Sequence, residues 1–293
     1  MIYGLAAALG WGFSDFAAAV SGRRVGAFAT VVVSHIGSAV LTTVLVLVVA
    51  PDLSWLREVG PWLGPIAILM TAGYYAFYRG LELGPVSVVS PVLASYAVGP
   101  VVLAIVLLGE SLSLVVAGGI VLTIVGTALA STDLRTLRTG VERAPGLRWA
   151  IAASALFGVG AYVFGWASRR AGWLPAIWFS RSLSAVLFLV WAVAEAARRR
   201  PGDQRARDRP APFRLSTAAV GLAVAIGFVD TVAASAYGRG SEVGYISIVT
   251  AASAIYPVLP VLAGTVFLHE RPAPNQAVGV AILIAGLMAV GLG

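Results

Sequence analysis

Cysteine and lysine are absent from the chain of 293 residues, and histidine occurs only twice. Without cysteine the chain can form neither a disulfide nor a reactive thiolate. Two histidines without clustered carboxylates provide no ligand set for a metal ion, so we predict neither a metal nor another cofactor. All 20 basic side chains therefore belong to arginine, and they outnumber the 13 acidic side chains to give a net charge of +7.

Charge of either sign is scarce along the chain. Charged residues make up 11% and hydrophobic residues 59% of it, and the mean hydropathy is +0.91. Soluble domains carry about a quarter charged residues, so the composition predicts an integral membrane protein surrounded by the lipid bilayer. A pI of 10.2 would suggest a nucleic-acid partner in a soluble protein. Here the arginines lie in loops between apolar segments, where they determine orientation, and we predict no nucleic-acid partner.

Apolar segments of about 20 residues, long enough to cross a bilayer as helices, occur ten times. They lie near residues 2–20, 26–49, 61–80, 86–108, 112–130, 147–167, 173–195, 215–237, 245–268 and 274–292. No basic residue precedes the first segment, which we therefore interpret as a spanning helix and not as a cleaved signal peptide.

One long stretch of the sequence occurs twice. Residues 79–110 match residues 239–270 without a gap, at an offset of 160 (270 minus 110). The matched pairs are Arg79/Arg239, Gly80/Gly240, Glu82/Glu242, Gly84/Gly244, Ser87/Ser247, Tyr96/Tyr256, Pro100/Pro260 and Glu110/Glu270. The earlier helices match at an offset of 146, which aligns His35 with Arg181. The sequence thus predicts a tandem duplication.

The two repeats divide the chain into two domains. We predict a first five-helix repeat at 1–131, a basic connector at 132–146 and a second five-helix repeat at 147–293, which contains a basic loop at 197–214. Because each half has an odd number of helices, the halves enter the membrane in opposite directions, an arrangement typical of secondary transporters. The predicted fold is an all-α integral membrane protein with ten transmembrane helices in two inverted five-helix repeats.

The sequence resembles the ten-helix drug/metabolite transporter superfamily, specifically its EamA-like branch, over nearly the whole chain. The most specific marks are the two fourth-helix ends, VLLGE at 106–110 and VFLHE at 266–270, each followed by a glycine-rich helix. The resemblance implies alternating access about a binding site that is lined by the first, third, fourth, sixth, eighth and ninth helices.

The arginines predict the orientation. If the N-terminus lies outside the cytoplasm, fifteen of the 20 arginines fall in cytoplasmic loops. The positive-inside rule then favours both termini outside, in the plasma (inner) membrane, although relatives of the family are expected the other way up.

Four ionisable residues lie inside the predicted spans, where a charge is costly unless it meets a partner or water. They are Asp15, His35, Arg181 and Asp230. Their depths, at about 1.5 Å per residue, predict one pair between Asp15 and His35 and another between Arg181 and Asp230. The second pair could equally be architectural. The repeat places an alanine and a methionine opposite the two aspartates, so the scaffold itself does not require either carboxylate.

Aromatic residues could complete a binding site with these charges, because their rings stack on a substrate while tyrosine hydroxyls bond to it. The predicted substrate-binding set is Trp11, Asp15, Tyr74, Tyr78, Tyr96, Asp230, Tyr237 and Tyr256. The predicted charge network is Asp15, His35, Arg181 and Asp230. For any single aromatic, packing or lipid contact is the alternative interpretation.

Other conspicuous residues have structural interpretations. Salt bridges at helix ends are predicted for Arg79–Glu82 and Arg239–Glu242, and likewise for Glu110 and Glu270. Close packing of the fifth helix of each half is predicted from Gly118, Gly119, Gly126, Gly279 and Gly286. Interrupted fourth and ninth helices, either fixed kinks or gates, are predicted from Pro91, Gly99, Pro100, Pro257 and Pro260.

The predicted function is secondary transport of a small organic metabolite, amino-acid-like, amphipathic or cationic, across the inner membrane. A lipid or lipid-linked phosphate flippase of the same fold is the alternative. No HExxH, GxSxG or Gly-rich phosphate loop is present, so no enzyme is predicted. We expect Asp15 to be the proton or cation site and His35 to tune its proton affinity. Proton coupling, and a monomeric or homodimeric state, stay open at this point.

Overall fold

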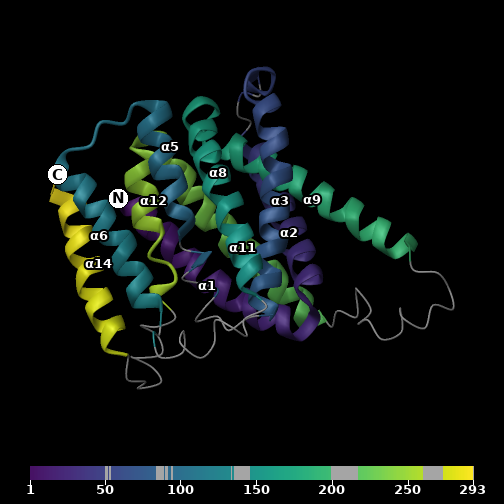
Figure 1. The fold of residues 1–293 in the computed structure, drawn as a ribbon. Helices are drawn as coiled ribbons and strands as arrows, with labels where there is room; N and C mark the ends of the chain where they lie inside the picture. The colour runs from purple at the N-terminus through teal and green to yellow at the C-terminus, as the bar shows by residue number, and fades with distance from the viewer. Residues whose placement is uncertain are drawn as a thin grey trace.

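Long apolar helices form a bundle in the computed structural model of the chain (Figure 1). The described residues are 1–49, 52, 54–83, 89, 92–93, 95–132, 134, 146–198, 217–259 and 273–292. Within these residues, six helices are long and apolar enough to cross a membrane. They are α2 (Ala27–Val49), α6 (Leu114–Ser131), α8 (Leu147–Ala171), α9 (Trp173–Arg198), α11 (Thr217–Val243) and α14 (Pro274–Leu292). The chain is thus a helical, multi-pass membrane protein.

Two further helices, α1 (Ile2–Val25) and α3 (Gly60–Leu83), have 24 residues each but are not among those six. Both are long enough to span a bilayer, and both carry glycine, aromatic and polar side chains among their apolar residues. Trp11 and Asp15 of α1 and Tyr74 of α3 are examples, and all three line the cavity described below. Some of the residues that lower the hydropathy of these two helices therefore line the interior cavity.

The predicted fourth and ninth spans are interrupted. In the described part of the fourth, a 3-10 turn, η2 (Ser95–Ala97), leads into α5 (Val98–Leu108). In the ninth, α12 (Ile246–Ser253) ends in turns at 254–257, which include Pro257. Pro100 lies in the first turn of α5, where its missing N–H is tolerated. The two remaining prolines of this prediction, Pro91 and Pro260, lie outside the described residues.

A single glycine connects consecutive helices at equivalent places in the two halves. Gly26, with φ 93°, joins α1 to α2, and Gly172, with φ 86°, joins α8 to α9. These backbone angles are accessible to glycine without a Cβ clash. The two residues differ by 146, the offset of the early repeat, so the repeat extends to backbone conformation.

Helix packing follows the same equivalence. α1 packs along α11, and its repeat counterpart α8 packs along α3, the counterpart of α11. Contacts between α2 and α9 and between α6 and α14 join the halves. The largest cluster of buried side chains takes residues from both halves, among them Val31, Phe77, Phe188 and Ile226. The interior between the halves is thus where any site shared by them would lie.

The fifth helices of the two halves, α6 and α14, lie side by side at one edge of the bundle (Figure 1). A Cβ on Gly119 would lie 2.9 Å from the carbonyl oxygen of Gly286, so only glycine permits this approach. The close packing predicted for these helices is confirmed. Gly118 is the exception, since a Cβ there would meet nothing within 4 Å, and its predicted packing role is wrong because it faces away from α14.

The salt bridges predicted at helix ends are present where the structure describes their residues. Arg79 pairs with Glu82, and Arg239 with Glu242 at 2.8 Å. Glu110 pairs with Arg169 at 2.6 Å, but its side chain is only 2% exposed, which places it in a buried network instead of at the surface.

Several sequence predictions fall on residues outside the described ranges. From the repeat and the predicted interruptions they are Gly84, Ser87, Pro91, Pro260 and Glu270. From the arginines assigned to cytoplasmic loops they are Arg135, Arg138, Arg143, Arg199, Arg200, Arg205, Arg207, Arg209, Arg214 and Arg271. The count of ten spans, the inversion of the halves and the outward orientation of both termini stay predictions.

Candidate functional site

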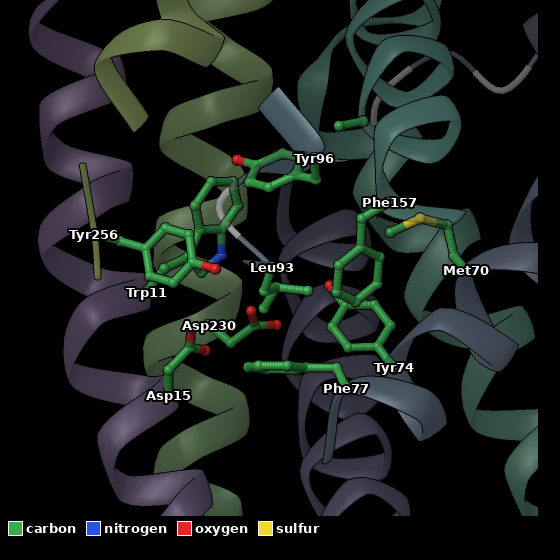
Figure 2. Close-up of a pocket in the computed structure, with 11 residues that line it drawn as sticks. Trp11, Asp15, Met70, Tyr74, Phe77, Leu93, Tyr96, Phe157, Asp230 and Tyr256 are labelled. Atoms are coloured by element: carbon green, nitrogen blue, oxygen red, sulfur yellow. The ribbon is translucent and has the colours of Figure 1, made fainter. Parts of the chain in front are cut away.

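A cavity lies among α1, α3, α8, α11 and the interrupted helices (Figure 2), with about 490 Å³ of empty space when the open solvent at its mouth is included. Its lining residues are Trp11, Asp15, Met70, Tyr74, Phe77, Leu93, Tyr96, Phe157, Ala161, Asp230 and Tyr256. We call it the aromatic cavity. Six of the eight residues predicted to bind substrate lie around it, and they come from both halves of the chain.

The aromatic cavity has two unlike walls. Asp15 of α1 and Asp230 of α11 lie close together on one side, and Phe77, Phe157 and Met70 lie on the opposite side (Figure 2). Because α1 packs on α11 and α3 packs on α8, the acidic wall belongs to the first pair of helices and the apolar wall to the second. A ligand in this cavity would meet negative charge on one side and rings on the other.

The predicted ion pair between Arg181 and Asp230 is present. Arg181 Nη2 lies 2.6 Å from Asp230 Oδ2, and the two side chains are 5% and 15% exposed. Trp11 lines the same cavity as Asp230. Removing two charges from water is costly, and such a short contact offsets that cost. The charge of Asp230 is therefore already compensated in the ligand-free cavity.

His35 belongs to this ion pair, and its predicted pairing with Asp15 is wrong. His35 Nε2 lies 3.3 Å from Arg181 Nη1, and Nδ1 lies 3.0 Å from the Val31 carbonyl oxygen. Arginine only donates, so Nε2 accepts and Nδ1 carries the proton that is donated to Val31. His35 is thus neutral and occupied at both nitrogens. Depth along the helix axis suggested the Asp15 pairing, but depth says nothing about which face of α2 carries the ring.

Aromatic side chains also pack against the guanidinium of Arg181. The Cζ atom of Arg181 lies 5.0 Å from the centre of the Tyr74 ring, within the range of cation–π attraction. The His35 ring meets Tyr74 and Phe188 edge to face, with centroids 4.5 and 5.1 Å apart. Arg181 is therefore held in one place by a carboxylate, an imidazole and a phenol ring.

The predicted tyrosines differ in their surroundings. Tyr96 lines the cavity and its hydroxyl lies 3.3 Å from Ser253 Oγ. Tyr256, at 4% exposure, also lines it, but its hydroxyl has no hydrogen-bond partner among the described residues. Tyr237 bonds to Thr250 at 2.7 Å and lines a neighbouring cavity. Tyr78 lines neither cavity and lies 3.5 Å from Ser34, so the structure gives it a packing position.

A second cavity adjoins the first, with about 580 Å³ of empty space when open solvent is included. Trp11, Met70, Tyr74 and Ala161 line both. The second cavity continues towards the start of α3 and the ends of α8 and α11, where it is lined by Leu63, Phe164 and Tyr237. Arg181 lines this second cavity and its partner Asp230 lines the first, so the ion pair stands at the boundary between the two.

Comparison with known proteins shows the family of the chain. The model of the EamA-like transporter family matches residues 1–132 and 144–292, which is nearly the whole chain. The chain belongs to the EamA-like transporter family. Members of this family, within the drug/metabolite transporter superfamily, are membrane transporters and not enzymes. No curated protein matches the chain.

A solved structure described only as "Crystal structure of protein" shares the fold of this EamA-like transporter. The TM-score is 0.74 at 20% sequence identity, over 99% of this chain and 96% of that chain. Identity this low supports a common fold and says nothing about a shared substrate.

The lining of the transporter's cavity follows the internal repeat. Eight of the lining residues form four repeat-equivalent pairs, Trp11/Phe157, Asp15/Ala161, Met70/Asp230 and Tyr96/Tyr256. The cavity therefore lies where equivalent surfaces of the two halves meet. Both carboxylates break the equivalence, since an alanine and a methionine take the corresponding places.

Five lining residues were not anticipated from the sequence. They are Met70, Phe77, Leu93, Phe157 and Ala161. All are apolar, and apolar residues in a span look the same whether they face lipid or a cavity. A signal did exist for four of them: the repeat offsets carry Asp230, Tyr237, Trp11 and Asp15 onto Met70, Phe77, Phe157 and Ala161.

Metal-ligating side chains do not gather in this site. In the portion of the chain that the structure describes, no three histidine, cysteine, aspartate or glutamate residues come together. The groups available to a ligand are thus carboxylates, a hydroxyl and aromatic rings.

Proposed function

We propose that this EamA-like protein is a secondary transporter that moves a small organic metabolite across the inner membrane by alternating access. The observation that supports it best is the aromatic cavity, whose lining combines equivalent residues of both halves. In an inverted-repeat transporter, substrate binds where the repeats meet, and rocking of one half against the other changes which side the site faces.

Two adjoining cavities suit such a cycle. The boundary between them consists of the four residues that line both cavities, Trp11, Met70, Tyr74 and Ala161. A substrate in the aromatic cavity would leave through the second cavity once these side chains and the Arg181–Asp230 pair rearranged. Differential binding of the substrate to the two arrangements would drive the change.

Asp15 is the proposed site of proton or cation coupling. It lines the aromatic cavity, and among the described residues it has no ion-pair partner, whereas Asp230 has Arg181. An intramembrane carboxylate of this kind is neutralised by a proton or by a bound cation. Proton coupling therefore belongs to the proposal, as do an inner-membrane location and termini outside the cytoplasm.

A lipid or lipid-linked phosphate flippase fits the cavity less well. Phosphate recognition needs clustered cations, but the cavity region holds two carboxylates against one guanidinium. Arg181 is also engaged by Asp230 and His35. The excess of negative charge favours a metabolite over a phosphate-bearing lipid.

The test is uptake by vesicles that contain the purified protein. A panel of amino acids, amines, sugars and organic acids is offered with and without a pH gradient, and accumulation is measured by mass spectrometry against protein-free vesicles. We expect gradient-dependent accumulation of at least one small organic compound. Accumulation of none, together with movement of labelled phospholipid between leaflets, would favour the flippase.

A further inference from the structure

We propose that the aromatic cavity selects a monovalent organic cation, a protonated amine with an apolar body, and binds it in one orientation. This inference rests on the proposed function and names its substrate class. The amine would meet Asp15 and the Tyr256 hydroxyl, and the body would meet the rings of α3 and α8.

The count of charges sets the valence of the ligand. Asp15 and Asp230 line the cavity, and the single guanidinium beside them, Arg181, is paired with Asp230 at 2.6 Å. His35 adds no charge, because it accepts from Arg181 and donates to Val31. One carboxylate, Asp15, is thus left over, and when it is ionised a single positive charge on the ligand balances it in place of a proton. A dication or an anion would leave the low-dielectric site with an uncompensated charge.

The Tyr256 hydroxyl distinguishes a protonated amine from a fully substituted ammonium. It is buried, it lines the cavity on the side of Asp15 and Trp11 (Figure 2), and it has no hydrogen-bond partner among the described residues. A buried hydroxyl without a partner costs free energy. An N–H group of the ligand can donate to this oxygen, whereas a trimethylammonium group cannot. Its repeat equivalent, Tyr96, is already bonded to Ser253.

The unlike walls set the orientation. Exact repeat equivalence would give each wall the same groups. The repeat equivalent of Asp15 is Ala161, however, and that of Asp230 is Met70. Only the wall of α1 and α11 is acidic, so the cationic end is held there. Phe77, Phe157 and Tyr74 of the other wall provide faces for the body, and a ring near a cation adds cation–π attraction.

Binding to the full-length protein in lipid nanodiscs tests the inference with probes that share a phenylethyl body. The probes are 2-phenylethylammonium, 2-phenylethanol, 3-phenylpropionate and (2-phenylethyl)trimethylammonium, titrated calorimetrically at neutral pH against empty nanodiscs. We expect 2-phenylethylammonium to bind at least about tenfold more tightly than the neutral and anionic probes. It should also bind a few-fold more tightly than the trimethyl compound, because of the bond to Tyr256.

Variants assign the preference to named groups. Asp15→Asn should erase the advantage of the cation over 2-phenylethanol, and Asp15→Glu, which keeps the charge, should retain it. Tyr256→Phe should erase only the advantage of the N–H-bearing cation over the trimethyl cation. Glu58→Gln, in an exposed ion pair with Arg170, serves as the control and should change none of these ratios. Thermal unfolding of each sample establishes that the variant is folded.

The inference is overturned if the parent binds 2-phenylethanol or 3-phenylpropionate as tightly as the cation. It is equally overturned if Asp15→Asn keeps the preference or a folded Asp15→Glu loses it. If one of these results is found and vesicles still take up neutral or anionic metabolites, the proposed transport function is supported and only the proposed substrate class is wrong.

Discussion

His35 and Arg181 occupy equivalent positions of the two sequence repeats, and in the structure they contact each other, with His35 Nε2 3.3 Å from Arg181 Nη1. Residues related by an internal repeat meet only where the two halves face each other, here between α2 and α9. The Arg181–Asp230 pair lies beside this meeting point. The buried ion pair and the contact between repeat-equivalent residues therefore lie in one small region.

The first prediction concerns the ion pair. Arg181→Ala and Asp230→Ala should each lower the free energy of unfolding by about 3–5 kcal/mol, because each leaves a buried charge without its partner. The double variant should recover about 1–3 kcal/mol of the summed loss. Unfolding in mixed detergent measures all four proteins.

The Arg239–Glu242 pair provides the matched control for this cycle, at 2.8 Å and with side chains 44% and 27% exposed. Its coupling should stay below about 1 kcal/mol, since water screens an exposed pair. Strict additivity at Arg181 and Asp230 would mean that the two residues do not stabilise each other.

The second prediction concerns a hydrogen-bond network around Glu110 and Arg169 at one end of the bundle, which we call the latch. Glu110 accepts hydrogen bonds from the Ser247 hydroxyl and N–H at 2.6 and 3.1 Å, and from the Ile246 N–H at 2.8 Å. Arg169 donates to Glu110 at 2.6 Å and to the Gly244 carbonyl oxygen at 2.6 Å. The latch therefore ties the ends of α5, α8 and α11 to the start of α12, at the end of the bundle to which the second cavity extends.

Glu110→Gln should loosen this latch, because it removes the charge that strengthens four contacts, and should cost roughly 2–4 kcal/mol of stability. It should also raise severalfold the rate at which an impermeant thiol reagent labels Ser180→Cys, which lines the second cavity. The natural chain has no cysteine, so this label reports on one site. Glu58→Gln should leave the labelling rate unchanged, and equal rates in both variants would argue against the latch.

The third prediction compares adjacent glycines in α6. Gly119→Ala should lower the free energy of unfolding by about 1–3 kcal/mol, because its methyl group would lie 2.9 Å from the Gly286 carbonyl oxygen. Gly118→Ala meets open space and should be neutral or stabilising by up to about 1 kcal/mol, since alanine favours helix. Equal destabilisation of the two variants would show that α6 and α14 are not this close.

Helix positions and half of the cavity were predictable from the sequence, and the reasons differ. Apolar run length predicted α2, α6, α8, α9, α11 and α14 to within six residues of their ends. Asp15 and Asp230 stood out because a carboxylate in a span needs an explanation. Phe157 and Met70 did not stand out, because nothing in composition separates a cavity wall from a lipid contact. His35 was misassigned because its rotation about the α2 axis is a tertiary property.

The fourth prediction concerns orientation, which rests on the arginine distribution alone. A reporter fused after Gly293 should be active only if it is of a type that works outside the cytoplasm. A reporter that requires the cytoplasm, fused at the same position, is the matched control. Activity of that second fusion would mean that both termini lie inside.

The fifth prediction concerns Asp15, which carries the central claim that the aromatic cavity is a transport site with one uncompensated carboxylate. Asp15→Asn keeps the size and a hydrogen-bonding oxygen but removes the charge. The variant should insert and fold like the parent, because Asp15 has no ion-pair partner among the described residues and is not required by the repeat.

The most direct measurement compares gradient-driven accumulation by vesicles that contain the parent, Asp15→Asn or the control Glu58→Gln, over a range of external pH. The substrate is the compound that the parent accumulates most strongly in the metabolite panel. We predict that Asp15→Asn loses accumulation against a gradient while Glu58→Gln matches the parent. Accumulation by Asp15→Asn equal to that of the parent, with the same dependence on pH, would contradict the account.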